Sequence, residues 1–243
     1  MNIALIGSGG REHALCQKIY QSKLSKNIIC IPGNAGTSTI AKNININFLN
    51  FKNLLRTIKS NKIDLVIVGP EEPLVNGIAD YFNSEPMLSE VSLIGPDAEG
   101  AQLEGSKDFA KAFMKRHNIP TAKYGTFTKD SIDKGIAFLR AMNAPYVLKA
   151  DGPAAGKGVL ILNDLVKAKE EFSNMLLKNK FGEAGHKVVV EGFLSGIELS
   201  CFVLLDGKSY LTLPSAKDYK RIGEGDTGLN TGGMGSISPV PFA

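Results

Sequence analysis

Short apolar runs that stop at glycine or proline constrain the fold of the first hundred residues most strongly. Stretches with apolar residues at helical spacing lie between these runs. Strands that are apolar throughout are typical of parallel sheets buried on both faces, and their alternation with helices favours such a sheet. We therefore expect an α/β domain with strands at Asn2–Ile6, Asn27–Ile31, Asp64–Val68 and Val91–Ile94, and helices at Arg11–Tyr20, Phe51–Ser60 and Pro73–Phe82.

The pattern changes near residues 100–106, where we place a domain boundary. Beyond it, Asp206-Gly207 predicts a hairpin turn between two strands, which indicates an antiparallel part. Asp164 is placed to cap a helix over Asp164–Leu177. This half is predicted to be α+β, with a further helix over Ser106–His117 and strands at Lys123–Phe127, Tyr146–Ala150, Val159–Leu162, Val188–Glu191, Glu198–Leu205 and Ser209–Leu213.

Composition excludes several classes of protein. Hydrophobic residues make up 43% of the 243 residues, which rules out a disordered or fibrous chain. The net charge of +4 is spread evenly, so it is weak evidence for nucleic-acid binding. Cys16, Cys30 and Cys201 have no metal-ligand or disulfide spacing and are predicted to be buried thiols. No signal peptide or membrane-spanning run is found, so a reducing cytoplasm is the expected setting.

The first of three glycine clusters, Gly7 to Glu12, follows a strand and begins a helix. Free backbone N–H groups at such a helix start favour an anion. Glu12 stands where a dinucleotide fingerprint needs a small residue, and the strand ending at Ile31 lacks the acidic residue that would hold a ribose, so NAD is disfavoured. A phosphate-sized ligand partnered by Arg11 and a tight turn without ligand both remain open.

The second cluster, Lys149 to Gly158, does not have the spacing of a Walker A loop. A lysine ends one apolar strand, and a glycine and alanine loop carrying Lys157 leads to the next. This arrangement suits a flap that closes over nucleotide phosphates, with lysines as point charges. A solvated hairpin with two surface lysines is the alternative.

The third cluster, Asp218 to Gly235, combines charges, hydroxyls and glycines with hardly any apolar periodicity. We interpret it as a structureless substrate loop in preference to a linker, because long loops of this kind tend to be functional. Glu71-Glu72 is interpreted as a turn with solvated charges. No nucleophilic or metal-binding constellation stands out in the sequence.

Together these segments resemble the phosphoribosylamine–glycine ligase (glycinamide ribonucleotide synthetase) family of the ATP-grasp superfamily. The resemblance is collinear over essentially the whole chain. It rests on IGSGGREHAL, PGNAGT, DLVIVGPEEPLVNG, AQLEGSK, IPTAKY, VLKADGPAAGKGV, EGFLSGIELS and DYKRIGEGDTGLNTGGMGSISP. It implies a Rossmann-like domain over residues 1–104 and an ATP-grasp domain over 105–243, with a small nucleotide-binding subdomain at about 122–190.

The resemblance also implies a reaction and a set of site residues. ATP would phosphorylate glycine, and 5-phosphoribosylamine would attack the acyl phosphate, giving glycinamide ribonucleotide, ADP and phosphate in purine biosynthesis. The implied ATP site comprises Lys107, Lys149, Gly156, Lys157, Gly158, Glu191, Phe193, Leu194 and Glu198. Substrate binding falls to Gly9, Gly10, Arg11, Asp218, Lys220 and Gly232, and catalysis to Arg221, Asp226 and Asn230.

The chain departs from the family pattern in two respects. Pro153, Gly192, Tyr219 and Leu229 replace the residues common at their positions, and Gly192 removes one glutamate of the adenine and ribose stretch. The E-F-N-x-R-F-G-D-P-E stretch that binds Mg²⁺ (or Mn²⁺) is absent, so no metal ligand is expected within this chain. We expect an N-terminal fragment with little activity alone, from an enzyme that is a cytoplasmic monomer without nucleic-acid or membrane partners. A non-catalytic nucleotide- or phosphate-binding module and another ATP-grasp carboxylate–amine ligase are the alternatives.

Overall fold

The computed structural model describes residues 1–152, 158–178 and 186–242. It divides into two compact units, Met1–Phe193 and Leu194–Ala243. The predicted flap residues Gly156 and Lys157 lie outside the described residues. No helix in the described part of the chain is long and apolar enough to cross a membrane.

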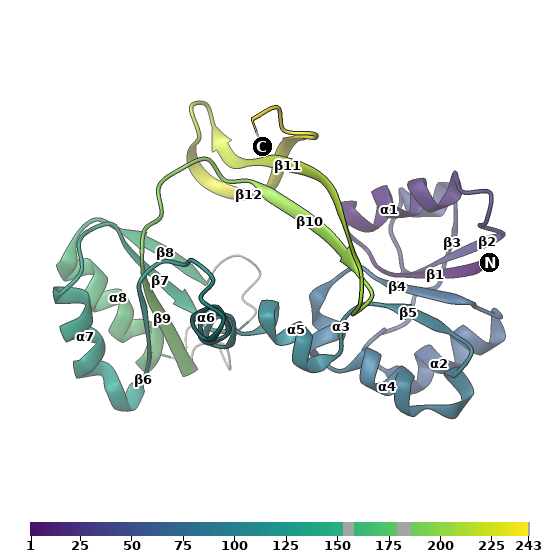
Figure 1. Ribbon diagram of the computed structural model, residues 1–243, viewed down its shortest axis with the longest axis horizontal. Helices are drawn as coiled ribbons and strands as arrows, with labels where there is room; N and C mark the ends of the chain where they lie inside the picture. The colour runs from purple at the N-terminus through teal and green to yellow at the C-terminus, as the bar shows by residue number, and fades with distance from the viewer. Residues whose placement is uncertain (153–157, 179–185, 243) are drawn as a thin grey trace. The chain divides into compact units, whose positions relative to one another are not determined.

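The first unit contains a parallel sheet of five strands in the order β3-β2-β1-β4-β5 (Figure 1). The central strand pairs with both neighbours over its apolar residues, so that Leu5 lies beside Cys30 on one side and Ile67 on the other. This confirms the predicted parallel α/β fold. The strands are β1 (Asn2–Gly7), β2 (Asn27–Pro32), β3 (Lys42–Asn43), β4 (Leu65–Val68) and β5 (Ser92–Ile94).

Helices flank this sheet and close its core. Leu54 and Ile58 on one helix are buried against the sheet residues Ala4 and Val66. The continuous helix predicted over Pro73–Phe82 is wrong, because Gly77 adopts φ 81° and separates two shorter helices. The helices are α1 (Gly10–Tyr20), α2 (Phe51–Ser60), α3 (Glu71–Val75), α4 (Ile78–Ser84) and α5 (Ala98–Gly105), with 3₁₀ turns η1 (Thr37–Thr39) and η2 (Pro86–Leu88). Glu71-Glu72 therefore begins a helix and is not the predicted turn.

A four-stranded sheet follows within the same unit, in the order β6-β9-β7-β8, and its strand pairs are antiparallel. Phe172 and Leu148 lie at the centre of its buried core. Asp164 accepts a hydrogen bond from the Lys167 N–H at 2.8 Å, which confirms the predicted N-cap. The elements are α6 (Lys107–Arg116), β6 (Tyr124–Thr128), η3 (Lys129–Ser131), α7 (Ile132–Arg140), β7 (Tyr146–Ala150), β8 (Val159–Leu162), α8 (Leu165–Leu177) and β9 (Lys187–Gly192).

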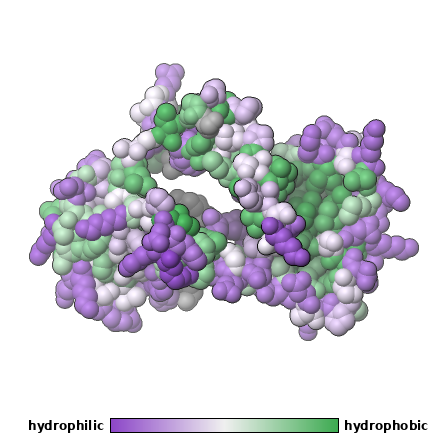
Figure 2. Space-filling view, in the orientation of Figure 1, coloured by the Kyte–Doolittle hydropathy of each residue, from purple (hydrophilic) through white to green (hydrophobic). Residues whose placement is uncertain are grey.

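The second unit is an antiparallel sheet of β10 (Ser200–Leu205), β11 (Tyr210–Gly223) and β12 (Thr227–Ile237). The hairpin turn at Asp206-Gly207 is confirmed. The structureless loop predicted over 218–235 is wrong, because most of it pairs in β11 and β12. These strands are largely exposed, and hydrophobic residues are visible on their hairpin in Figure 2, so no buried face imposes a two-residue apolar period.

The three thiols do not share one environment. Cys16 and Cys30 are buried, with their sulfur atoms 3.7 Å apart, as predicted. Cys201 is exposed on β10, so the prediction of a buried thiol is wrong at that position. β10 and the part of β11 that pairs with it contain no buried residue among those described, so this strand covers no core.

Candidate functional site

A buried cluster of charged side chains joins α6, β7 and β9. The Glu191 carboxylate on β9 forms ion pairs with Lys111 through Oε2 and with Lys149 through Oε1. Lys111 also donates a hydrogen bond to Thr121 Oγ1 at 2.7 Å. The antiparallel register places Val147 opposite Glu191, and Lys149 lies two residues along the same strand. Residues two apart on a strand share a face, so Lys149 can reach the Glu191 carboxylate, while Lys111 reaches it from α6.

Burial differs sharply within this cluster. The side chains of Glu191 and Lys111 are 6% and 11% exposed, while that of Lys149 is 29% exposed. Burial acts to raise the pKa of Glu191, but hydrogen bonds from Lys111 and Lys149 outweigh it and lower that pKa below its ordinary value. Glu191 is therefore an anion held between two ammonium groups, of which Lys149 is the one open to solvent.

A second part of the cluster lies at the start of α6. Lys107 Nζ donates to the backbone carbonyls of Asp151 and Gly152, at 3.3 Å each. The Asp151 carboxylate accepts hydrogen bonds from the Ser106 hydroxyl and the Asp108 N–H instead. Burial lowers the pKa of Lys107, against the opposing effect of Asp151. Among the described residues the Lys107 ammonium is bonded to carbonyl dipoles and to no carboxylate, so its charge is not paired before an anion arrives.

Other predicted nucleotide residues of the first unit lie around its four-stranded sheet. The Ala150 N–H donates a hydrogen bond to the Gly158 carbonyl at 2.8 Å, which joins the two ends of the predicted flap. Gly192 and Phe193 line a cavity of about 340 Å³ with Lys123 and the loop 141–145. A Cβ added at Gly192 would meet only ordinary contacts, with the Lys123 carbonyl oxygen at 3.9 Å and Met142 Cε at 4.0 Å. Leu194 begins the second unit and is 71% exposed.

The carboxyl ends of β1, β2 and β4 form a separate glycine-lined region. The Asn34 side chain donates to the carbonyls of Ser8 and Gly9 at 2.9 and 3.0 Å. The exposed Arg11 donates to the Gly69 carbonyl at 2.9 Å. Ligands of open parallel sheets bind at this edge of the strands. Gly9, Gly10 and Arg11 are therefore brought to the expected place for an anion.

Glu12 occupies the centre of this region. It is 5% exposed, and its Oε2 accepts a hydrogen bond from the Gly9 N–H at 2.6 Å. A Cβ added at Gly7, Gly9 or Gly69 would collide with the Glu12 side chain. Glu12, the residue that does not fit a dinucleotide fingerprint, is therefore the reason that Gly7, Gly9 and Gly69 lack side chains. The Gly9 N–H is already hydrogen-bonded to Glu12.

The second unit brings together part of the predicted substrate set. Lys220 Nζ lies 2.5 Å from Glu198 Oε1 and 3.4 Å from Asp218 Oδ2. Hydrogen bonding to Glu198 raises the pKa of Lys220. The β11–β12 register makes Arg221 and Asn230 cross-strand partners. The remaining residues lie along the hairpin, with Asp226 at its turn and Gly232 on β12.

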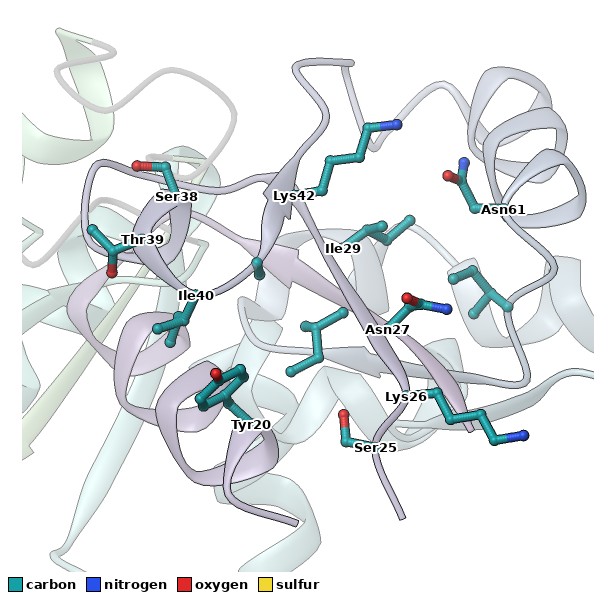
Figure 3. A pocket seen from close by; sticks show the side chains of 13 residues that line it. Tyr20, Ser25, Lys26, Asn27, Ile29, Ser38, Thr39, Ile40, Lys42 and Asn61 are labelled. Carbon is teal, nitrogen blue, oxygen red and sulfur yellow. The ribbon is translucent and has the colours of Figure 1, made fainter. Parts of the chain in front are cut away.

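A cavity of about 630 Å³ lies beside β2, between the end of α1 and the end of α2 (Figure 3). Lys26, Lys42 and Asn61 line it together with other polar residues. It contains none of the predicted site residues. It also lies at the amino end of β2, whereas ligands of such sheets bind beyond the carboxyl ends. We therefore do not include it in the candidate site.

Three residues of these sites had no predicted role. Lys111 follows Lys107 by four residues and so shares its helix face, but the spacing alone does not show that it meets Glu191. Asn34 and Thr37 lie in the quoted PGNAGT segment, where the Thr37 hydroxyl bonds to Asn43 at 2.8 Å. Their part in joining the glycine loops depends on contacts between distant strands, which the sequence pattern does not display.

Comparison with known proteins places these features in a family. The model of the phosphoribosylglycinamide synthetase N domain matches residues 1–104, and that of the ATP-grasp (A) domain matches residues 105–243. The chain belongs to the phosphoribosylglycinamide synthetase family. The resemblance inferred from the eight segments is thereby confirmed, although the division of the chain at residue 104 and the roles of individual residues stay predictions.

Individual relatives agree with this assignment. The chain is similar to the phosphoribosylamine–glycine ligases of Escherichia coli O157:H7 (47% identical) and Pseudomonas syringae pv. tomato (49% identical), each over 99% of this chain and 55% of the relative. A solved phosphoribosylamine–glycine ligase from Thermotoga maritima superposes with a TM-score of 0.80 at 34% identity, covering 99% of this chain and 56% of that one. The chain therefore spans about 55% of the length of its curated relatives.

Proposed function

We propose that this protein is a phosphoribosylamine–glycine ligase. A glycine carboxylate oxygen attacks the γ-phosphorus of ATP and ADP leaves; the amine of 5-phosphoribosylamine then attacks the acyl carbon, loses a proton and expels phosphate. The observation that carries the proposal is the lysine cluster of α6 and β7 in a chain of this family. Such chemistry depends on positioned cations that stabilise transferring phosphoryl oxygens.

Each part of the site would serve one substrate. Lys107 and Lys149 would bind the ATP phosphates beside the flap residues Gly156, Lys157 and Gly158, with adenine and ribose near Glu191, Phe193, Leu194 and Glu198. Gly10 and Arg11 would hold the phosphate of phosphoribosylamine, together with Gly9. The β11–β12 hairpin would present Asp218, Lys220, Arg221, Asp226, Asn230 and Gly232 to glycine and the amine.

Several further properties belong to the same proposal. The protein would act as a cytoplasmic monomer on small-molecule substrates. Mg²⁺ (or Mn²⁺) would accompany ATP. The described residues contain no group of three or more histidine, cysteine or carboxylate side chains that fits a metal ion. They therefore do not fit a resident metal site, and we assign the ion no step on these residues.

Nucleotide binding tests the proposal directly. We predict that Lys149→Ala weakens binding of ADP to the 243-residue chain by about tenfold or more, because it removes a charge-assisted phosphate contact. Isothermal titration calorimetry measures this affinity. The matched control is Lys167→Ala, which removes an exposed lysine from α8, outside the proposed phosphate site. Equal ADP affinity in Lys149→Ala and wild type would contradict the phosphate assignment.

Substrate choice needs the complete catalytic apparatus. A chimera can join this chain to the part of the Escherichia coli ligase that lies beyond the matched residues. We expect ADP release that depends on both glycine and phosphoribosylamine. Release with a different carboxylic acid would indicate another carboxylate–amine ligase, and nucleotide binding without turnover would indicate a non-catalytic module.

A further inference from the structure

The three charged groups at the centre of the lysine cluster do not have equal access to solvent. Glu191 and Lys111 are enclosed, and Lys149 alone of the three is substantially exposed, at 29% of its side chain. An anion arriving from solvent therefore meets Lys149 first. At that moment the Lys149 ammonium is bonded to Glu191, so a phosphate must compete with a buried carboxylate for it.

Drawing Lys149 away from Glu191 has an electrostatic consequence. A buried carboxylate that loses its partner is strongly destabilised, because neither water nor a second charge replaces the lost interaction. Glu191 has such a second charge in Lys111, on its other carboxylate oxygen. In the described part of the chain no third ammonium is bonded to Glu191, since Lys107 is bonded to the carbonyls of Asp151 and Gly152.

The surroundings of Lys111 fix it in this position. Its ammonium donates to Thr121 Oγ1 at 2.7 Å and lies 5.6 Å from the centroid of the Tyr124 ring. Both interactions hold the ammonium beside Glu191. Lys111 is also 9% exposed overall, so it cannot itself turn toward a ligand in solvent. Its location suits a constant counter-ion and not a phosphate ligand.

We propose that Lys111 is a positioning residue that keeps Glu191 neutralised while Lys149 transfers from Glu191 to the nucleotide phosphates. The inference rests on the proposed nucleotide function and adds a residue to it. Without Lys111, Glu191 retains Lys149, and phosphate binding must overcome that buried ion pair. The affinity for adenosine should not depend on Lys111 in this way, because adenosine has no phosphate to attract Lys149.

The experiment compares ADP with adenosine in the 243-residue chain by isothermal titration calorimetry. The ratio of the adenosine and ADP dissociation constants isolates the phosphate contribution from contacts of the base and ribose. We expect Lys111→Met to lower this ratio about tenfold or more. Lys111→Arg, which keeps the charge, is expected to stay within about threefold of wild type. The double variant Lys111→Met/Glu191→Gln is expected to recover the ratio, because the amide no longer retains Lys149.

The outcomes separate this inference from the proposed function. A wild-type ratio well above one together with an unchanged ratio in Lys111→Met would overturn the inference and leave the nucleotide site intact. Equal affinities of the wild type for ADP and adenosine would overturn both. A lowered melting temperature with an unchanged ratio identifies a merely structural lysine and also overturns the inference. If Lys111→Met does not fold, the double variant and Lys111→Arg decide. Lys149→Ala gives the ratio of dissociation constants expected when Lys149 contributes nothing to phosphate binding. A ratio that low in both the double variant and Lys111→Arg would refute the proposed role.

Discussion

As whole residues, Glu12 and Glu191 are both 5% exposed, but the chain surrounds these two carboxylates in opposite ways. Glu12 lies against the backbone of Gly7, Gly9 and Gly69 and accepts one backbone N–H. Among the described residues no lysine or arginine forms an ion pair with it. Glu191 is instead held between two ammonium groups. One region accommodates a carboxylate by shape and the other by charge.

This difference determines how each region can meet an anionic ligand. In the glycine-lined region the carboxylate already uses the Gly9 amide, so an anion is left with the amides further along α1 and with Arg11. In the lysine cluster an anion can exchange with the carboxylate for the solvent-exposed Lys149. The first region is therefore a fixed scaffold, while the second contains ion pairs that ligand binding can rearrange.

The largest expected effect comes from removing the charge at the lysine cluster. Glu191→Gln keeps the shape of the side chain but leaves Lys111 buried without its anion. Breaking a buried pair in this way costs about 3–5 kcal/mol of unfolding free energy. Urea unfolding measures the loss. Lys187→Met is the control, because its ion pair is largely solvated and is worth about 1 kcal/mol or less. A Glu191→Gln variant as stable as the control would show that the cluster is not electrostatically coupled.

A smaller effect is expected from filling the space beside Glu12. Gly69→Ala places a methyl group where the Glu12 side chain lies, and such overpacking costs about 1–3 kcal/mol. Gly10→Ala is the matched control, because nothing lies within 4 Å of its added Cβ and alanine favours the helix. Thermal unfolding of both variants checks the difference.

A second substitution identifies the cause of that loss. Combining Gly69→Ala with Glu12→Ala should give less than the sum of the two separate losses, since the methyl group then has no carboxylate to displace. Additive losses would mean that Gly69 is required for some reason other than the space occupied by Glu12.

The sequence predicts much of this architecture where burial imposes a pattern. The apolar runs of β1, β2, β4 and β5 identify the parallel sheet, and Asp164 identifies the start of α8 through its own hydrogen bond. The loop predicted over 218–235 is wrong because the exposed strands β11 and β12 have no buried face to impose alternation, and because glycine is also typical of turns. Their pairing comes from backbone hydrogen bonds across a hairpin, which composition does not record.

The sites divide in a similar way. Lys107 and Lys149 are visible in the sequence because glycine-rich segments adjoin them. Lys111 lies inside an ordinary amphipathic helix, where a lysine usually faces solvent. Only the packing of α6 against β7 and β9 turns it inward to Glu191. Glu12 differs from Lys111, because the sequence alone shows that it does not fit a dinucleotide fingerprint. Its contacts with three glycines become visible only in the folded sheet.

The smallest effect is expected from the charge of Glu12. Glu12→Gln preserves an oxygen that can accept the Gly9 N–H and a side chain that fits between the glycines. It loses the stronger hydrogen bond of a charged acceptor, but it also removes the cost of burying a charge that has no cationic partner. These terms oppose each other, so we expect the unfolding free energy to change by less than about 1 kcal/mol in urea unfolding. The same exchange of carboxylate for amide should thus be severe at Glu191 and mild at Glu12. A loss at Glu12 as large as that at Glu191 would mean that the glycine-lined region also depends on charge, and the contrast between the two regions would fail.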